Sequence, residues 1–169
     1  MKHSFFRIFL ALSNILNIIL PPTRCFNLKR FFYKTSGCVI EKGVKMVGGS
    51  KIHFSNIEIK TGTWVGANVN FYCSKQGRIT IGKNNDIAPN VLINTGTHEI
   101  GTAQKRAGLD KGHDITIGNG CWIGMGALIL SGTQVGNGCI IAAGAVVKGT
   151  FPDNVMIAGV PGIIKKQLS

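Results

Sequence analysis

Aliphatic residues recur at every sixth position over much of this chain. An α-helix buries residues about 3.6 positions apart and an isolated strand buries every second residue, so a period of six fits neither element. A short strand followed by a turn, repeated many times, would place one aliphatic residue inside at each side of a flat-sided solenoid. The clearest run comprises Ile117, Ile123, Ile129, Val135, Ile141 and Val147.

The same period appears earlier in the chain, and small residues support it. A small residue stands four places after most members of the clearest run, and glycine often follows the aliphatic residue directly. Valine and isoleucine suit strands, whereas glycine and asparagine suit corners. We therefore expect an all-β solenoid of about five coils over residues 37–162. The earlier members are Ile81, Ile87 and Ile93, then Ile59, Val65 and Phe71, and more weakly Ile40, Met46 and Ile52.

The period is interrupted in two places. About four extra residues around 75–78 predict a corner loop, and residues 99–116 predict a long polar loop inserted into the solenoid. Functional residues often lie on such insertions, because a rigid scaffold positions them. His98 stands where the longer insertion begins. A histidine at a loop edge is usually ordinary, but this position makes His98 a candidate proton acceptor.

Residues 1–36 form a different segment, with an apolar run from Phe5 to Leu20 that ends at two prolines. Polar residues within it are three or four positions apart, which predicts an amphipathic helix with a narrow polar stripe. The run lacks a signal-peptide cleavage site and is too short for a membrane span. Two alternatives remain: the apolar face packs on the domain or another subunit, or the segment contacts a membrane peripherally. The stripe comprises Ser4, Arg7, Asn14 and Asn17, with Ala11 between.

The chain is strongly basic. It has 169 residues, with 19 lysines and arginines against 7 acidic residues, for a net charge of +12. The apolar share of 44% excludes a disordered polyelectrolyte, so the charge calls for an anionic partner. Six of the basic residues and none of the acidic ones lie within positions 1–40, and residues 163–169 form a basic tail. No nucleic-acid-binding motif is found, so a nucleic acid is not expected.

Cysteine and histidine usage favours neither a disulfide framework nor a metal site. The five cysteines are odd in number and contain no CxxC pair, which is typical of reduced thiols in a reducing compartment. A β-helical carbonic anhydrase needs three histidines that converge on zinc. The four histidines of this chain lack such spacing, so we expect no metal.

The repeat resembles that of the hexapeptide-repeat acyltransferases. The segment THEIGTAQKRAG…DITIGNGCWIG is similar to their maltose and galactoside O-acetyltransferase branch, and DNVMIAGVPG is similar to their closing coil. The resemblance covers roughly residues 37–166. It implies a left-handed parallel β-helix and a homotrimer with active sites between subunits. It also implies acetyl-CoA as co-substrate and a hydroxyl of a saccharide or surface-glycan precursor as acceptor.

The resemblance implies roles for individual residues. His98 would act as general base on the acceptor hydroxyl, and the backbone N–H of Met125 would stabilise the oxyanion. Acceptor-binding residues would be Asn68, Asn70 and Arg106. CoA-binding residues would be Trp122, Gly124, Ala143, Lys148, Lys165 and Lys166. Structural alternatives stay open: Trp122 capping a side of the solenoid, Asn68 at a corner, and Lys165 and Lys166 as solvated charges.

Two departures from the branch bear on the acceptor. The loop at 74–78 reads SKQGR, without the aspartate that contacts the acceptor sugar in the branch, and no arginine follows Pro161. The basic first segment is closer to enzymes that O-acetylate surface polysaccharides, which places the protein in the cytoplasm or at the inner face of the membrane. Alternatives are a serine O-acetyltransferase, although its acidic helical domain is lacking, and a non-catalytic β-helix scaffold.

Overall fold

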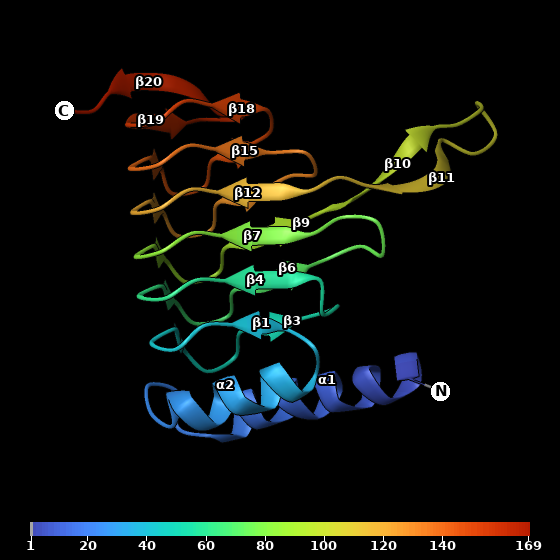
Figure 1. Ribbon diagram of the computed structural model, residues 1–169. Helices are drawn as coiled ribbons and strands as arrows, with labels where there is room; N and C mark the ends of the chain where they lie inside the picture. The colour runs from blue at the N-terminus through green and yellow to red at the C-terminus, as the bar shows by residue number, and fades with distance from the viewer. Residues whose placement is uncertain (1) are drawn as a thin grey trace.

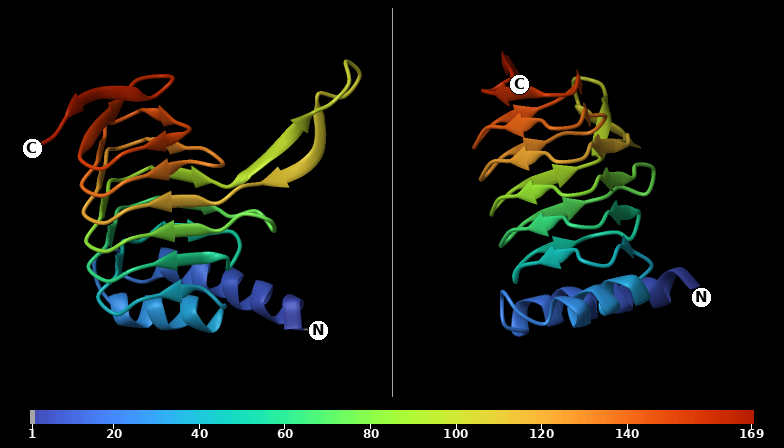
Figure 2. Two further views of the ribbon diagram at one scale, coloured as in Figure 1. Left: turned by 45° about the horizontal axis from the view of Figure 1, so that its top comes forward. Right: turned by 60° about the vertical axis from the view of Figure 1, so that its left-hand side comes forward.

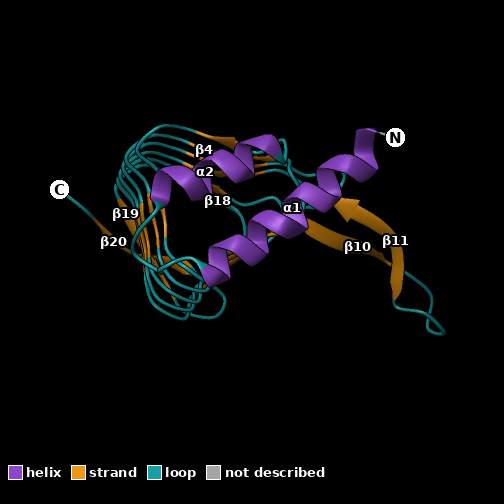
Figure 3. Cartoon of the chain, turned by 90° about the horizontal axis from the view of Figure 1, so that it is seen from below, coloured by secondary structure: helices purple, strands orange, loops and turns teal. Residues whose placement is uncertain are grey.

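A computed structural model describes residues 2–169, and side chains in the first helix from residue 6 onward. The chain forms a β-solenoid that stands on two helices, α1 (Lys2–Ile19) and α2 (Phe26–Thr35) (Figure 1). Seen along the solenoid axis, both helices lie across the same end (Figure 3). Within the described residues, neither is long and apolar enough to cross a membrane.

Three parallel sheets form the sides of the solenoid. The first contains β1 (Val39–Ile40), β4 (Ile57–Ile59), β7 (Ile79–Ile81), β12 (Ile115–Ile117), β15 (Gln134–Val135) and β18 (Thr150–Phe151). The second contains β2 (Lys45–Met46), β5 (Trp64–Val65), β8 (Asp86–Ile87), β13 (Trp122–Ile123), β16 (Ile140–Ile141) and β19 (Val155–Ala158). The third contains β3 (Lys51–Ile52), β6 (Asn70–Tyr72), β9 (Leu92–Asn94), β14 (Leu128–Ile129) and β17 (Val146–Val147). The solenoid has about six turns, one more than the sequence predicts.

The six-residue period marks the core, as predicted. Ile123, Ile129 and Ile141 are fully buried, and residues of successive coils stack in register, such as Ile81 on Ile117. Each coil therefore buries its aliphatic residues against the coils above and below it. The small cysteines Cys121 and Cys139, free and buried, also belong to this interior cluster. Burial raises the pKa of the Cys121 thiol to about 11, as expected of a thiol packed in the interior.

A steric constraint explains why glycine often follows the buried aliphatic residue. A Cβ atom on Gly124 would lie 2.5 Å from the backbone nitrogen of Ala143 in the next coil. The backbone leaves the strand here and passes directly beneath its neighbour, so a side chain has no room. Glycine after the aliphatic residue thus indicates that adjacent coils are closely spaced at this corner.

Helix α1 packs with its polar side, not its apolar side, against the solenoid. The Asn14 amide donates to the Ile52 carbonyl at 2.9 Å, and its oxygen accepts from the Ile52 N–H at 3.0 Å. Asn17 donates to Ser50 O at 2.7 Å, and Ser13 lies 2.8 Å from Ser36. The two asparagines satisfy backbone groups that the open end of a sheet leaves unpaired.

This orientation corrects one form of the first alternative, and packing on another subunit stays a prediction. An apolar helix face packed on the domain is wrong, because the buried stripe is largely polar and only Leu10 joins the interior apolar cluster. Of the predicted polar stripe, Asn14 and Asn17 face the solenoid. Arg7 is exposed, and Ser4 lies outside the residues whose side chains are described. Ser13, which the predicted stripe omitted, is buried.

Replacing Asn14 by alanine should destabilise the fold by about 1–3 kcal/mol, because both backbone groups of Ile52 then lose their partner in a sheltered place. The free energy of unfolding, measured by urea titration, checks this value. The neighbouring Ile15→Ala variant provides the control, since Ile15 is exposed and its loss should cost under about 0.5 kcal/mol. Equal losses for the two variants would contradict the capping role of Asn14.

The long insertion is a hairpin rather than a loop. Strands β10 (Gly96–Ile100) and β11 (Ala107–Gly112) pair antiparallel and project away from the stacked coils (Figure 2). Most of its side chains are exposed on both faces, so it lacks the alternation by which a strand is detected in sequence. The shorter insertion is the expected corner loop, closed by a hydrogen bond from Gly77 N to Ser74 Oγ.

The last residues also form a strand. The stretch predicted as a basic tail contains β20 (Ile163–Gln167), which pairs antiparallel with β19. It lies at the end of the solenoid opposite the helices (Figure 1). There it pairs with the edge of the last coil, which would otherwise expose free backbone groups.

Candidate active site

His98 lies in β10, where the hairpin leaves the solenoid, and it pairs across the hairpin with Asp110. Its Nδ1 atom lies 3.1 Å from Asp110 Oδ1. A carboxylate can only accept, so this contact favours the tautomer with the proton on Nδ1. The lone pair of the neutral ring is then on Nε2, the nitrogen that can act as a base. The hairpin thereby gives His98 an oriented, proton-accepting form.

Asp110 is a site residue that the sequence analysis missed. It lies twelve positions from His98, and only the register of the hairpin brings the two side chains together. The acidic residue next to His98 in sequence, Glu99, points elsewhere and contacts Lys111 Nζ at 2.6 Å. Neighbouring residues on a strand face opposite sides, so a cross-strand partner is the better candidate for orienting His98.

Two clefts meet at His98. One, of about 510 Å³, is lined by the corner loop at 74–76, Asn94 and Asp110. The other, of about 560 Å³, is lined by Leu130, Ser131 and Lys148. The histidine therefore has room on both sides, which a base between two substrates requires. Lys148 is the only predicted CoA-binding residue that lines either of these two clefts.

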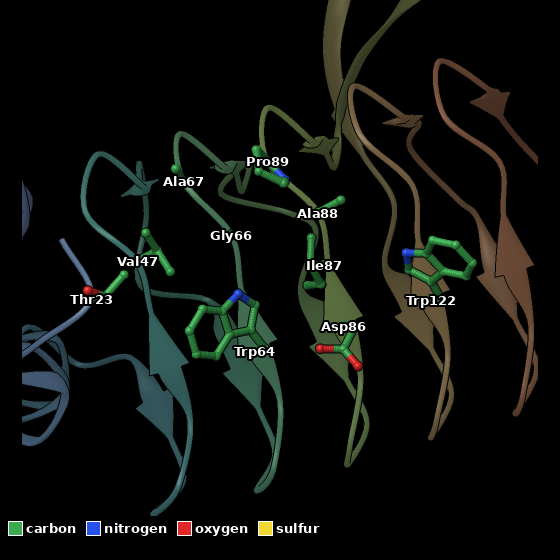
Figure 4. A pocket seen from close by; sticks show the side chains of 10 residues that line it. All are labelled: Thr23, Val47, Trp64, Gly66, Ala67, Asp86, Ile87, Ala88, Pro89 and Trp122. Atoms are coloured by element: carbon green, nitrogen blue, oxygen red, sulfur yellow. The ribbon is translucent and has the colours of Figure 1, made fainter.

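A second group of predicted residues surrounds Trp122. Trp122 is exposed on the second sheet, in register with Asp86 and, one coil further, Trp64. These three side chains line a groove of about 620 Å³ and follow one another along the sheet (Figure 4). Trp122 also lines a neighbouring cleft with Lys166. An indole on an open face fits a binding surface better than it fits a cap over the core.

The corner after Trp122 carries the predicted oxyanion donor. Gly124 is the residue whose close contact with the next coil excludes a side chain, and Ala143 is the neighbour that it would meet. The Met125 carbonyl accepts from Gly144 N at 2.9 Å. Within the described part of the chain, the Met125 N–H donates to no protein atom. It is therefore available to an oxygen atom of a ligand.

The predicted acceptor-binding residues are dispersed. Asn68 is exposed at a corner with a positive φ of 56°, and the Asn70 amide donates to its carbonyl at 3.0 Å. The left-handed backbone gives Asn68 a structural reason to be asparagine. Arg106 lies toward the hairpin tip, where its guanidinium donates to Gly101 O at 3.4 Å. Lys165 is exposed in β20.

One chain does not gather the whole predicted site. His98 and Lys148 lie at the corner between the third and first sheets, whereas Trp122 and Lys166 lie on the second sheet. Neither cleft beside His98 includes Trp122. No group of three or more histidine, cysteine or acidic residues that could hold a metal ion occurs among the residues with a described position.

Comparison with known proteins supports the fold and the class. Residues 114–149 match the family model for the bacterial transferase hexapeptide (six repeats). A Dictyostelium discoideum protein provisionally named an acetyltransferase is 52% identical over 90 residues, which are 53% of this chain and 47% of that protein. The galactoside O-acetyltransferase of Lactococcus lactis subsp. lactis (strain IL1403) is 27% identical over 122 residues, 72% of this chain and 56% of that enzyme.

A solved galactoside acetyltransferase in complex with coenzyme A superposes with a TM-score of 0.84, at 23% identity over 99% of this chain and 82% of that one. The match confirms the left-handed parallel β-helix. The chain spans about half the length of the curated relatives it matches. Its repeat and fold are those of the hexapeptide-repeat acetyltransferases, to which the chain is similar.

Proposed function

We propose that this protein is an acetyl-CoA-dependent O-acetyltransferase that acts on a hydroxyl of a saccharide or surface-glycan precursor. The observation that carries the proposal is the His98–Asp110 pair at the meeting point of two clefts on a hexapeptide solenoid. The relatives support it, because one is named a galactoside O-acetyltransferase and a similar fold was solved with coenzyme A. We place the activity in the cytoplasm, where the five free cysteines would stay reduced.

The chemistry follows from the orientation of the imidazole. His98 Nε2 accepts the proton of the acceptor hydroxyl while that oxygen attacks the thioester carbonyl of acetyl-CoA. Asp110 stabilises the imidazolium that forms. The backbone N–H of Met125 donates to the oxyanion of the tetrahedral intermediate. The intermediate then expels the CoA thiolate, which takes the proton from His98, and the acetyl ester is released.

A homotrimer would complete the site. The residues around Trp122 and those around His98 lie on different sides of one solenoid, so a neighbouring subunit would bring its Trp122 groove to the hairpin of the first. Lys148 would face the acetyl-CoA from one subunit and Lys166 from the other. Point charges of this kind suit the phosphates of CoA.

The proposal is tested by acceptor-dependent release of the CoA thiol. The full chain is mixed with acetyl-CoA and a panel of saccharides, and free thiol and acetylated product are measured together. Binding of CoA by calorimetry provides an independent measurement. Absence of CoA binding, or thiol release that no saccharide stimulates, would overturn the assignment.

Asp110→Ala should lower kcat by about tenfold while the KM for the acceptor changes less, because the role proposed for Asp110 is to orient His98. Loss of the carboxylate also removes the contact that favours the Nδ1–H tautomer, so the conservative Asp110→Asn variant should keep the position of the ring but lose its carboxylate acceptor. Glu99→Ala is the matched control, since this carboxylate pairs with Lys111 in the same hairpin. Equal losses of activity in the two alanine variants would show that the hairpin is disturbed in general, and would contradict the orienting role of Asp110.

A further inference from the structure

We propose that the outer side of the two helices is a docking surface for an anionic lipid membrane. This outer helical face is defined by apolar side chains of α1 and α2 that point away from the solenoid. The inference concerns where the protein works and is independent of acyl transfer. The face comprises Ile8, Leu12, Ile15 and Ile19 of α1, with Leu28 and Phe31 of α2.

The apolar residues of α1 form one continuous stripe. They are four, three and four positions apart, so they lie on one side of the helix. Each is exposed, from 47% for Leu12 to 72% for Ile19. Isolated exposed apolar residues are normal, but a contiguous stripe of large aliphatic side chains marks an interaction surface.

The opposite side of α1 shows that this stripe has no role in packing within the chain. The solenoid end needs hydrogen-bonding side chains, and Asn14 and Asn17 supply them, while Ser13 contacts Ser36 at the end of α2. A helix that only capped the solenoid could carry polar residues on its outer side as well. The isoleucines and leucine there instead favour a partner with an apolar surface.

Charge distinguishes a lipid surface from a second copy of the chain. Arg7, Arg24 and Lys34 are exposed within the same helical segment, and no acidic residue precedes Glu41. Two copies that met through this face would bring like charges together without a carboxylate to pair them. Anionic headgroups satisfy the cations while the acyl boundary accepts the aliphatic side chains.

The two helices are tied to each other at one end of the solenoid. The Lys29 ammonium is buried and donates to the carbonyls of Pro21 and Pro22, at 3.0 and 2.9 Å, which ties the end of α1 to α2. Both helices lie across one end of the solenoid (Figures 1 and 3). Docking through this end would stand the solenoid upright, with the hairpin and the clefts at His98 open to the side.

The test is co-sedimentation of the full chain with vesicles of phosphatidylcholine alone or mixed with phosphatidylglycerol. We expect binding to the mixed vesicles, weakened by salt, and a loss of about tenfold or more in the Leu12→Glu/Ile15→Glu variant. The control is Ile100→Glu/Leu109→Glu, which changes two exposed apolar residues of the hairpin and should bind like the wild type. Circular dichroism verifies that each variant is folded.

Three results would overturn the proposal. One is a wild-type chain that does not sediment with the mixed vesicles, and another is a double variant that binds as well as the wild type. The third is a wild-type chain that does not bind vesicles and has a larger mass in solution than the double variant. That result would show that a second copy of the chain covers this face. Should the double variant not fold, Arg24→Ala/Lys34→Ala must weaken binding to the mixed vesicles instead.

Discussion

His98→Ala should lower kcat for acetyl transfer by about 10²–10⁴-fold, the range that a positioned general base contributes. The variant lacks the only group that we assign to accept the hydroxyl proton, whereas the clefts on both sides of His98 are lined mainly by other residues. Binding of CoA should therefore stay close to the wild-type value. Product formation with the best acceptor saccharide and calorimetric binding of CoA measure the two quantities separately.

His53→Ala is the matched control for this prediction. His53 is also exposed, but its ring stacks on Tyr72 at 3.9 Å between centroids and lines neither cleft beside His98. Its replacement should leave kcat within about twofold of the wild type, as for a residue outside the reaction. Retention of more than a tenth of the activity by His98→Ala would show that another group accepts the proton. Added imidazole should partly restore the rate if the base alone is missing.

The part of the fold that repeats could be predicted from the sequence. Ile117, Ile123 and Ile129 each occupy the buried position of a strand, so a period of six translates directly into three sides of a coil. The place of His98 was also predictable, because the interruption of a strict repeat is visible without any knowledge of contacts. Local periodicity is sufficient for both inferences.

The partner of His98 could not be predicted, because it depends on a contact between segments distant in sequence. Asp110 meets His98 only through the hairpin register, and the hairpin itself has no apolar alternation. The orientation of α1 was left open between two alternatives for a related reason. Amphipathic patterns are interpreted on the rule that apolar residues face inward, whereas the open end of a sheet requires hydrogen bonds, and Asn14 and Asn17 supply them.

Phe71→Ala should destabilise the protein by about 3–5 kcal/mol, the usual cost of removing a large aromatic side chain from a core. Phe71 is fully buried in β6, where it stacks between Ile52 and Ile93 of the adjacent coils. The cavity would therefore weaken both coil interfaces rather than one side chain's contacts. Strand β9, which leads into the hairpin, loses support directly, so activity should fail at a lower urea concentration than in the wild type.

Tyr72→Ala, at the next position of the same strand, is the control. It shows whether the loss of stability depends on the burial of the aromatic side chain or only on its size. Its side chain points outward, is 40% exposed and stacks on His53, so its loss should cost only about 0.5–1.5 kcal/mol. Urea unfolding of both variants provides the comparison. A similar loss of stability in both would mean that the alternation of inward and outward residues along β6 is not as described. A large loss only for Phe71 would show that the six-residue period marks the positions on which the stability of each coil depends.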